Sequence, residues 1–295
     1  MMHLPELIIL DVGHGNSAIL QDINAVTVID CPPPSTLVDT LERLGIDTID
    51  HILISHSDLD HAGGLPTLLD EITVRNVYIN PDANNNSQSW VDIRIALELA
   101  EDRGTKVHTS LTSTSSKRIK SGQVEIEILA PSVGVALGGA GGPDLSRRKQ
   151  SSNTMSVVIG LIHNSSRVIL FPGDMSEHGL DNLVKKQQNI EAQILVFPHH
   201  GGGPGNKNGY EFAQKLCKLV NPDLVVFSLG RNHLFGPNHE ENPRDDIMRG
   251  VVSALPSAHI MCTQLSGKCA AKEPISDFSH LTNLPARGFR SSSCC

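Results

Sequence analysis

The sequence has few aromatic residues and no long apolar run. Of its 295 residues, one is Trp, two are Tyr and seven are Phe, which leaves little material for stacking nucleic-acid bases on side chains. No apolar run approaches the ~20 residues that a membrane-spanning helix needs. The N-terminal segment MMHLPELIILDVG has neither a basic region nor a long apolar core, so we expect no signal peptide. We therefore expect a cytoplasmic protein without a membrane segment.

Cysteine pairs and an excess of basic residues are also absent. The six cysteines, at 31, 217, 262, 269, 294 and 295, form no C-x-x-C pair, which favours reduced thiols. The net charge is −8, which argues against a surface that wraps duplex DNA mainly by charge. A nuclease that uses metal ions is not excluded, because bound cations invert the sign of a local acidic site.

Short apolar segments alternate with segments of helical spacing along most of the chain. Strands are predicted at residues 7–11, 17–21, 25–30, 51–55, 74–79, 106–108, 123–129, 155–162, 167–171, 192–197, 224–228 and 259–264. Helices are predicted at residues 35–44, 65–71, 89–103, 180–188, 210–219 and 245–255, and a mobile loop at residues 132–152. Two strand-rich halves with interleaved helices indicate an α/β fold with helices outside two packed sheets. We expect one domain over residues 1–265 and a disordered C-terminal tail over residues 266–295.

Four side chains that can bind metals or transfer protons follow one predicted strand. The segment ISHSDLDHAGGL, residues 54–65, contains His56, Asp58, Asp60 and His61, and such loops often carry function. Imidazole and carboxylate together suit Zn, Fe or Mn. Helix capping in a polar loop is the alternative. Four such groups in six residues could instead serve two ions about 3.5–4 Å apart.

Three other predicted strands end in the same kinds of side chain. Asp30 ends one, Asp174 ends LFPGD, and His199 and His200 lie in VFPHHGG. Taken alone, Asp174 is equally a turn or helix-cap residue, and the histidine pair could belong to a turn. Together, these strand ends are harder to explain by chance, and they predict one shared site.

The order of these motifs resembles that of the metallo-β-lactamase-fold hydrolases. The segment His56-x-Asp58-x-Asp60-His61 looks like their signature. The aspartate at position 58 resembles the hydrolase domain of ComEC-type DNA-uptake proteins and their free-standing soluble relatives. The branch motifs Asp-Val-Gly-Gln-Gly-Asp-Ser, Gly-Asp, His-His-Gly-Ser and Ser-x-Gly-x-x-Asn-x-Tyr-Gly-His-Pro are matched, some partly, by residues 11–17, 173–174, 199–202 and 228–237. The resemblance implies a four-layer αββα sandwich of the metallo-β-lactamase type and a metal-dependent hydrolase.

The resemblance also implies a role for each residue. Two divalent ions, Zn or Mn, would be bound by His56 and Asp58 (first ion), by Asp60, His61 and His200 (second ion), and by Asp174 (both). Asp60 and His199 would also take part in catalysis or contact substrate, and Asp30 would orient a ligand histidine.

The chain departs from the family pattern at the first ion. Many members carry a further ligand histidine before the Gly-Asp pair, and only His108 and His163 lie in that interval. If the hairpin of residues 155–171 centres on Ser165, His163 lies at its far turn, while Asn153 and Ser156 face the metal end. The first site is then short of ligands, or is completed by water, Asn153 or substrate.

Two further departures concern histidines. His14 stands where the branch has glutamine, at a turn near the predicted site. Pro237 replaces the histidine of the Gly-His-Pro element, with His233 and His239 on either side. One of these two could act as a general acid, and the alternative is that both are ordinary surface histidines.

We therefore expect hydrolysis by a hydroxide that two metal ions activate, with nucleic acid or another phosphodiester as substrate. Arg147, Arg148 and Lys149 could contact a phosphate backbone, although a solvated basic loop explains them more simply. One alternative is a hydrolase of a small ester, lactone or thioester. Another is a non-catalytic binding or sensor protein with a degraded metal site.

Overall fold

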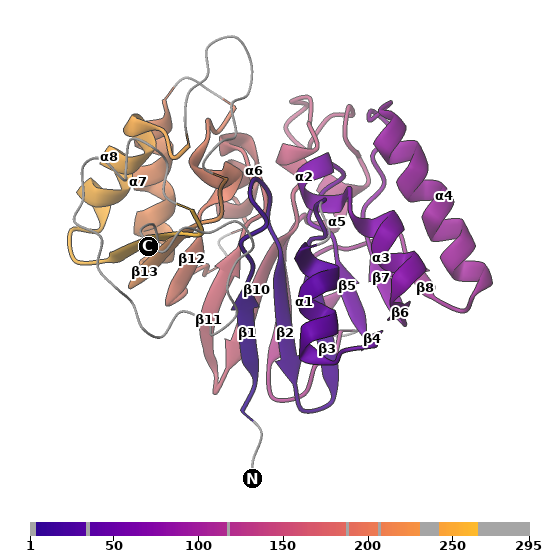
Figure 1. Cartoon of the computed structure of the whole chain (residues 1–295). Coiled ribbons are helices and arrows are strands. Elements are labelled where there is room, and N and C mark those ends of the chain that lie inside the picture. Colours follow the sequence, from indigo (N-terminus) through magenta and orange to yellow (C-terminus); the bar gives the residue numbers. More distant parts are fainter. Residues whose placement is uncertain are drawn as a thin grey trace.

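Two six-stranded sheets form the centre of the molecule in the part of the chain that the computed structural model describes, residues 4–33, 36–116, 119–186, 189–205, 208–230 and 242–264 (Figure 1). The first sheet has the strand order β1 (Glu6–Ile9), β2 (Ala18–Asp22), β3 (Ala25–Ile29), β5 (His51–Leu53), β7 (Asn76–Tyr78), β8 (Lys106–His108). The second has the order β14 (His259–Cys262), β13 (Leu224–Phe227), β12 (Ile194–Val196), β11 (Ser166–Phe171), β10 (Val158–His163), β9 (Glu125–Ala130). A small extra pair joins β4 (Thr48–Ile49) to β6 (Thr73–Val74).

Helices cover the outer face of each sheet (Figure 1). The first sheet carries α1 (Thr36–Leu44), α3 (Leu65–Glu71) and α4 (Gln88–Asp102), and the second carries α6 (Glu177–Val184), α7 (Gly209–Val220) and α8 (Asp245–Ala254). Two four-residue helices, α2 (Leu59–Ala62) and α5 (Val133–Ala136), and 3₁₀ turns at Asn153–Met155 and Pro198–Gly201 lie in connecting segments. The predicted α/β class and four-layer αββα sandwich are confirmed.

Alternation of side chains along each strand builds separate apolar layers. Ile52 packs with the helices outside the first sheet, whereas its neighbour Leu53 packs between the two sheets. Leu195 and Val196 divide in the same way in the second sheet. Successive residues of a strand point to opposite faces, so a strand that is covered on both faces is apolar throughout. Burial of these layers is the main source of stability.

Parallel pairing brings the motif-bearing segments to one edge. Strands β3, β5, β7 and β8 are parallel, and so are β11, β12, β13 and β14. Each motif lies just beyond the carboxyl end of one of these strands. Asp30 follows β3 and His56 follows β5, while Asp174 follows β11 and the His199–His200 pair follows β12. Because parallel strands present their carboxyl ends at the same edge, these segments meet there, as the sequence predicts.

Two expectations differ from the structure. The strand predicted at residues 74–79 is divided into β6 and β7, which pair in different sheets. The segment predicted as a mobile loop, residues 132–152, contains the short helix α5 and is fastened by the buried Asp144. That carboxylate accepts hydrogen bonds from the backbone N–H groups of Ser146 (2.7 Å) and Arg148 (2.8 Å) and lies 2.7 Å from Nε2 of His178.

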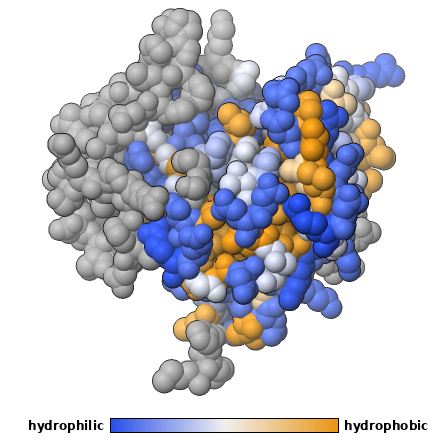
Figure 2. Space-filling view, turned by 45° about the vertical axis from the view of Figure 1, so that its right-hand side comes forward, coloured by the Kyte–Doolittle hydropathy of each residue, from blue (hydrophilic) through white to orange (hydrophobic). Residues whose placement is uncertain are grey.

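The outer helical surface is mixed in character. On α4, Ile95 and Leu99 are about half exposed, and Figure 2 shows hydrophobic residues at the surface among hydrophilic ones on the face that it presents. None of the helices in the described part of the chain combines the length and apolar character of a membrane span. The predicted tail over residues 266–295, like His233 and His239, lies outside the described residues.

Candidate metal centre

The opening motif forms a tight turn followed by α2. Asp58 occupies the N-cap position of α2, but its side chain accepts no capping hydrogen bond. Its Oδ2 instead lies 3.5 Å from Nε2 of His56. Helix capping, the simplest structural explanation for an aspartate at this position, therefore does not account for Asp58.

The two glycines after the motif allow a close approach of backbones. A Cβ on Gly64 would lie 2.5 Å from the carbonyl oxygen of Pro32, and one on Gly63 would lie 2.6 Å from that of Leu59. The N–H of Gly64 donates to the carbonyl oxygen of Cys31 (2.8 Å). This packing holds α2 against the segment that follows β3 and so places His61 next to Asp30.

His61 and His200 are each fixed through Nδ1. The Nδ1 of His61 donates to Oδ2 of Asp30 (2.8 Å), and that of His200 donates to the carbonyl oxygen of Ser228 (2.7 Å). In a neutral ring the other nitrogen, Nε2, then carries a lone pair. The two Nε2 atoms lie 3.3 Å apart and face one another.

His56 is held in the same sense. Its Nδ1 lies 3.0 Å from Oγ of Ser55, which itself donates to Oδ2 of Asp30 (2.9 Å). The Nε2 of His56 is buried and has no hydrogen-bond partner. All three rings therefore turn Nε2 toward the interior of the site.

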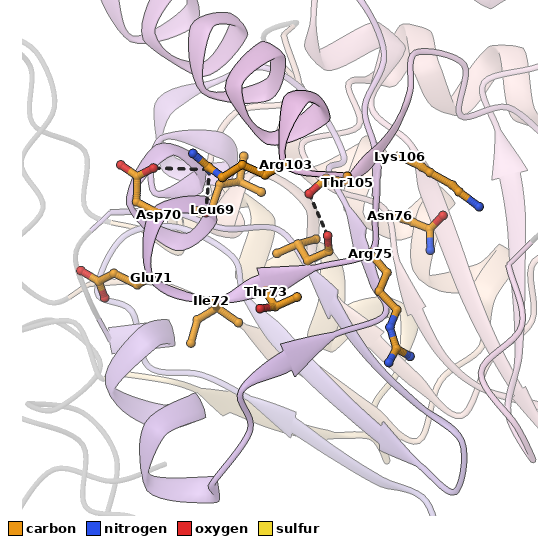
Figure 3. Close-up of a pocket in the computed structure, with 12 residues that line it drawn as sticks. Leu69, Asp70, Glu71, Ile72, Thr73, Arg75, Asn76, Arg103, Thr105 and Lys106 are labelled. Carbon is orange, nitrogen blue, oxygen red and sulfur yellow. Dashed lines mark hydrogen bonds and ion pairs between the residues drawn. The ribbon is translucent and has the colours of Figure 1, made fainter.

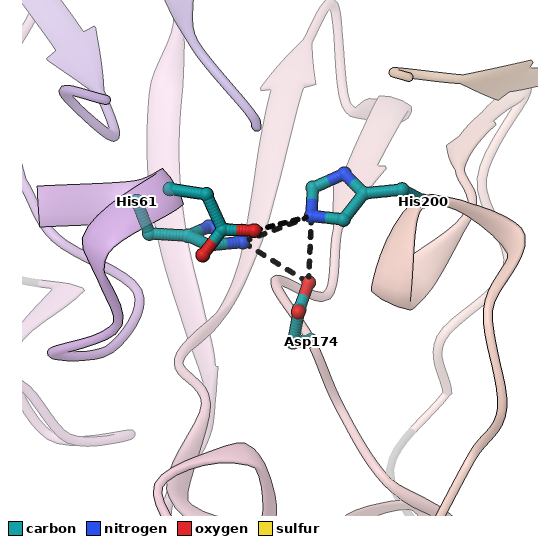
Figure 4. A group of neighbouring side chains, drawn as sticks. His61, Asp174 and His200 are labelled. Atoms are coloured by element: carbon teal, nitrogen blue, oxygen red, sulfur yellow. Dashed lines mark hydrogen bonds and ion pairs between the residues drawn. The ribbon is translucent and has the colours of Figure 1, made fainter. Parts of the chain in front are cut away.

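The carboxylate of Asp174 lies between two groups of side chains. Its Oδ1 is 3.1 Å from Nε2 of His61 and 3.5 Å from Nε2 of His200, and these residues converge in Figure 4. Its Oδ2 is 3.0 Å from Nδ1 of His199 and 4.0 Å from Nε2 of His56. We call His56, Asp58, Asp174 and His199 the first group, and Asp60, His61, Asp174 and His200 the second group.

The second group is the more compact of the two. One ligand atom from each of its four residues lies within 4.8 Å of all the others. The Oδ2 of Asp60 is 3.3 Å from Nε2 of His200 and 3.3 Å from Nε2 of His14. The ring of His14 also packs on that of His200, with centroids 4.4 Å apart.

These residues fit a metal centre by two observations. The buried Nε2 of His56 has no partner, and the Nε2 atoms of His61 and His200 face one another at 3.3 Å, which is unfavourable unless a proton or a cation lies between them. The donors are imidazole nitrogens and carboxylate oxygens, which suit Zn or Mn. Outer partners such as Asp30 fix the ring orientation, as is usual for metal-binding histidines.

Mutual charge stabilises the cluster. Burial raises the pKa of Asp174, but the nearby His61 and His200 and a hydrogen bond from His199 outweigh it and hold the pKa well below its usual range. Burial lowers the pKa of His61, but Asp174 and Asp30 raise it well above the ordinary value. The site thus holds positive charge among buried carboxylates, which a divalent cation would also provide.

The cluster opens to solvent on one side. The side chains of His56, His61, Asp174 and His200 are nearly fully buried, whereas those of Asp58, Asp60 and His199 are 39%, 26% and 27% exposed. A small molecule or a chain end would therefore approach past these three residues.

Of the other residues named in the sequence analysis, Asn153 and Ser156 contact residues of the two groups, whereas His163 and His108 do not. Asn153 lies 2.7 Å from Nε2 of His199, and the Oγ of Ser156 accepts from the N–H of Asp174 (3.2 Å). His163 pairs with Ser166 across the hairpin turn. His108 stacks on Tyr78 and is hydrogen-bonded to Asn76, and neither histidine belongs to the two groups.

The sequence predicts Asp30 as a residue that orients a histidine, but it does not predict two other partners of the rings. Ser55 and the carbonyl of Ser228 hold His56 and His200. Ser55 could have been noticed as a hydroxyl at a strand end directly before His56. The role of Ser228 has no signal in the side chain, because the backbone carbonyl makes the contact.

A separate surface pocket of about 510 Å³ lies at the other end of the strands. It is lined by residues around the starts of β7 and β8, among them Asn76, Arg75 and Lys106 (Figure 3). Arg103 there donates to the carbonyl oxygen of Leu69 (2.9 Å). This pocket contains no residue of the two groups, and we assign it no part in the chemistry.

Comparison with known proteins agrees with the fold. The family model described as the metallo-beta-lactamase superfamily matches residues 10–228. ComE operon protein 3 of Bacillus subtilis (strain 168) is 24% identical over 211 residues, which are 70% of this chain and 23% of that protein. The chain therefore spans about a quarter of the length of this relative.

Solved structures resemble the whole sandwich. Tm1679, a metal-dependent hydrolase of the beta-lactamase superfamily, aligns with a TM-score of 0.53 at 17% identity, covering 88% of this chain and 96% of the other. The metallo-beta-lactamase fold protein YhfI from Bacillus subtilis aligns with a TM-score of 0.52 at 14% identity, with coverage of 88% and 96%. At these identities the likeness concerns the fold.

Proposed function

The chain belongs to the metallo-beta-lactamase superfamily, a superfamily of metal-dependent hydrolases, and from this premise we propose that it hydrolyses phosphodiesters, with nucleic acid as the substrate class. We place the activity in residues 1–265. The observation that carries the proposal is the carboxylate of Asp174, whose two oxygens face two different groups of ligands. Such an arrangement suits a pair of ions that share one carboxylate.

Two bound divalent ions, Zn or Mn, would supply Lewis acidity and a water ligand whose pKa is lowered toward about 7. His56 and Asp58 would hold the first ion, Asp60, His61 and His200 the second, and Asp174 both. Side chains at 3–4 Å from one another would need little rearrangement to do so.

The surrounding residues keep this donor set in place. Asp30 and the carbonyl of Ser228 fix the rings of His61 and His200 through Nδ1, so that Nε2 faces the second group. His14, which contacts both Asp60 and the ring of His200, lies where it would restrict the movement of that carboxylate. The partly exposed Asp58, Asp60 and His199 border the side by which substrate would enter.

The substrate class is proposed from the chemistry and from the resemblance. A pair of cations can stabilise both the attacking and the leaving oxygen at phosphorus, and they reverse the negative local charge that the carboxylates would present to a phosphate. The resemblance to the hydrolase domain of DNA-uptake proteins, together with the 24% identity to ComE operon protein 3, favours nucleic acid over a small phosphodiester.

The test uses protein freed of metal with a chelator and reloaded with Zn²⁺ or Mn²⁺. Substrates are bis(p-nitrophenyl) phosphate, single-stranded DNA and double-stranded DNA, with a thioester and a lactone beside them. We expect phosphodiester cleavage that falls at least about 100-fold in Asp174→Ala and is unchanged in His163→Ala. Turnover of the thioester or lactone with none of DNA would show a small-ester hydrolase. No turnover of any substrate, together with no metal uptake, would show a binding protein.

A further inference from the structure

The sequence lacks the ligand histidine that many relatives carry between the opening motif and the Gly-Asp pair, and the structure offers a replacement. We propose that His199 completes the first metal site through its Nδ1, with Asn153 holding the ring from the other side. This inference rests on the proposed metal centre, and it names a ligand of the first ion that the motif comparison does not supply.

Three separations within the first group approach those between ligands of one ion, although the group is less compact than the second. Ligand bonds of ~2.0–2.1 Å in a tetrahedral site place neighbouring ligand atoms about 3.4 Å apart. The Nδ1 of His199 lies 3.0 Å from Oδ2 of Asp174, and Nε2 of His56 lies 3.5 Å from Oδ2 of Asp58 and 4.0 Å from Oδ2 of Asp174. The first group with His199 therefore offers two imidazole nitrogens and two carboxylate oxygens.

The backbone turns two adjacent histidines toward different oxygens of one carboxylate. His199 and His200 both have left-handed conformations, with φ of 57° and 55°. Non-glycine residues avoid this region, so the conformation persists where the surroundings compensate for it. The turn places Nδ1 of His199 at Oδ2 of Asp174 and Nε2 of His200 near Oδ1. The N–H of His199 also donates to Oδ1 of Asp174 (3.2 Å).

The ring of His199 is oriented in the opposite sense to the other three. His56, His61 and His200 are held at Nδ1 and leave Nε2 free, whereas His199 is held at Nε2 by the amide of Asn153 (2.7 Å). The nitrogen left facing the carboxylate is Nδ1, and either ring nitrogen of histidine can bind a metal ion. This reversal is what a ligand from the turn after β12 needs in order to face the first group.

An amide suits this position because it can donate or accept. Without a cation, the NH₂ of Asn153 donates to Nε2, and the Nδ1–H of His199 donates to Asp174. With a cation at Nδ1, the ring proton resides on Nε2, and the amide must turn so that its oxygen accepts that proton. The pair His199–Asn153 can therefore exist in both states without an unpaired ring nitrogen.

The test titrates the metal-free protein with Co²⁺ and records the visible absorption of each bound ion, with a chromophoric chelator to measure affinity. Wild type is compared with His199→Ala, His199→Asn and the matched control His163→Ala, whose histidine lies at the distant hairpin turn. The asparagine variant keeps a residue that tolerates the left-handed backbone, so it separates loss of a ligand from loss of the turn. Thermal unfolding confirms that each variant is folded.

We expect two binding steps in wild type and in His163→Ala. Both His199 variants should retain the second-group step and weaken the other by at least about 10-fold, with altered absorption of that ion. Asn153→Ala should weaken the same step by about 10–100-fold, as for other outer partners of metal-binding histidines. Asn153→Asp should restore it, because a carboxylate accepts the Nε2 proton.

Several results would overturn the proposal. Unchanged affinities and unchanged spectra in both His199 variants would show that His199 is not a ligand, even if phosphodiester cleavage persists in wild type. A wild type that binds one ion or none would overturn it as well. If two ions bind and one step depends on His199, but no phosphodiester is cleaved, the ligand assignment stands and the proposed substrate fails.

Discussion

Which ring nitrogen a histidine leaves free decides what it can bind, and at this site hydrogen bonds to the opposite nitrogen make that choice. A carboxylate, a backbone carbonyl and a hydroxyl fix His61, His200 and His56, respectively, through Nδ1. The rings lose their conformational freedom when the protein folds, before any ion binds. Ion binding then has a smaller entropic cost, which favours high affinity. At the residue scale, the site is thus preorganised by neighbours that would not touch the ions.

Asp30→Asn tests this preorganisation. The amide keeps the shape but loses the charge that favours an Nδ1–H on His61, so metal affinity of the second group should fall by about 10–100-fold. Competition with a chromophoric chelator measures the loss. Asp50→Asn is the matched control, since Asp50 accepts from the N–H of Val26 and pairs with Arg75 away from the site. Equal affinities in the two variants would show that Asp30 does not orient a ligand.

Residue types were easier to predict than residue roles. The strand-end motifs pointed to His56, Asp58 and Asp174 because polar side chains after apolar runs are conspicuous. The different placements of His199 and His200 depend on two left-handed backbone conformations, which no spacing rule specifies. The carbonyl of Ser228 could not be found at all, because every residue has one.

At the scale of elements, the contact between α2 and the segment after β3 is made by glycine. In Gly64→Ala, a Cβ would lie 2.5 Å from the carbonyl oxygen of Pro32, so a backbone must shift. We expect a loss of about 1–3 kcal/mol in the free energy of unfolding, measured by urea denaturation. Gly134→Ala in α5 meets only the flexible side chain of Leu145 at 3.3 Å and should change stability by less than about 1 kcal/mol. Equal losses would contradict this account.

The buried Asp144 should stabilise the segment at residues 132–152 through its hydrogen bonds to the backbone. Asp144→Ala leaves the N–H groups of Ser146 and Arg148 without their acceptor, which should cost about 1–3 kcal/mol. Urea denaturation at pH 7 measures the loss, with the exposed Lys149→Ala as control.

The pH dependence of this effect has a definite sign. Burial raises the pKa of Asp144, but a hydrogen bond from His178 and those from the backbone outweigh it and hold the pKa below its usual range. A depressed pKa contributes stability above the unfolded value of about 4, and this contribution is lost as pH falls through the folded value. The difference between wild type and Asp144→Ala should therefore shrink on acidification below pH 4. A difference that grows there would contradict the assignment.

Most long elements follow from sequence periodicity, and the short ones do not. The helix predicted at residues 89–103 is observed as Gln88–Asp102, and the strand predicted at 106–108 as Lys106–His108. Helices α2 and α5 have four residues each, too few to show a helical period. A mobile loop is predicted around Asp144 because polar composition alone does not reveal the side-chain hydrogen bonds to backbone that fasten this segment.

At the scale of the whole molecule, the candidate ligands come from both halves of the sandwich. His56 to His61 follow a strand of the first sheet, and Asp174, His199 and His200 follow strands of the second. The layered fold was predictable from two strand-rich halves with interleaved helices. That the carboxylate of Asp174 faces two groups of candidate ligands could be seen only from the relative placement of the two sheets.

Metal binding across the two sheets should stabilise the entire domain. An ion at 100 times its dissociation constant adds about 2.7 kcal/mol per site to the free energy of unfolding. The Tm of the metal-free protein should therefore rise on addition of Zn²⁺ or Mn²⁺ and fall again with excess chelator. Asp174→Ala should show a much smaller rise, and His163→Ala the full rise. The same Tm with and without metal would contradict a site that joins the sheets.

The shared metal centre is best tested by the metal content of reloaded and desalted protein, measured by elemental analysis for wild type and for Asp174→Ala. We expect about two ions per wild-type chain and a clear fall in the variant, because one carboxylate would serve both groups. A wild type that retains no ion after reloading, or a variant that retains as many as wild type, would contradict it.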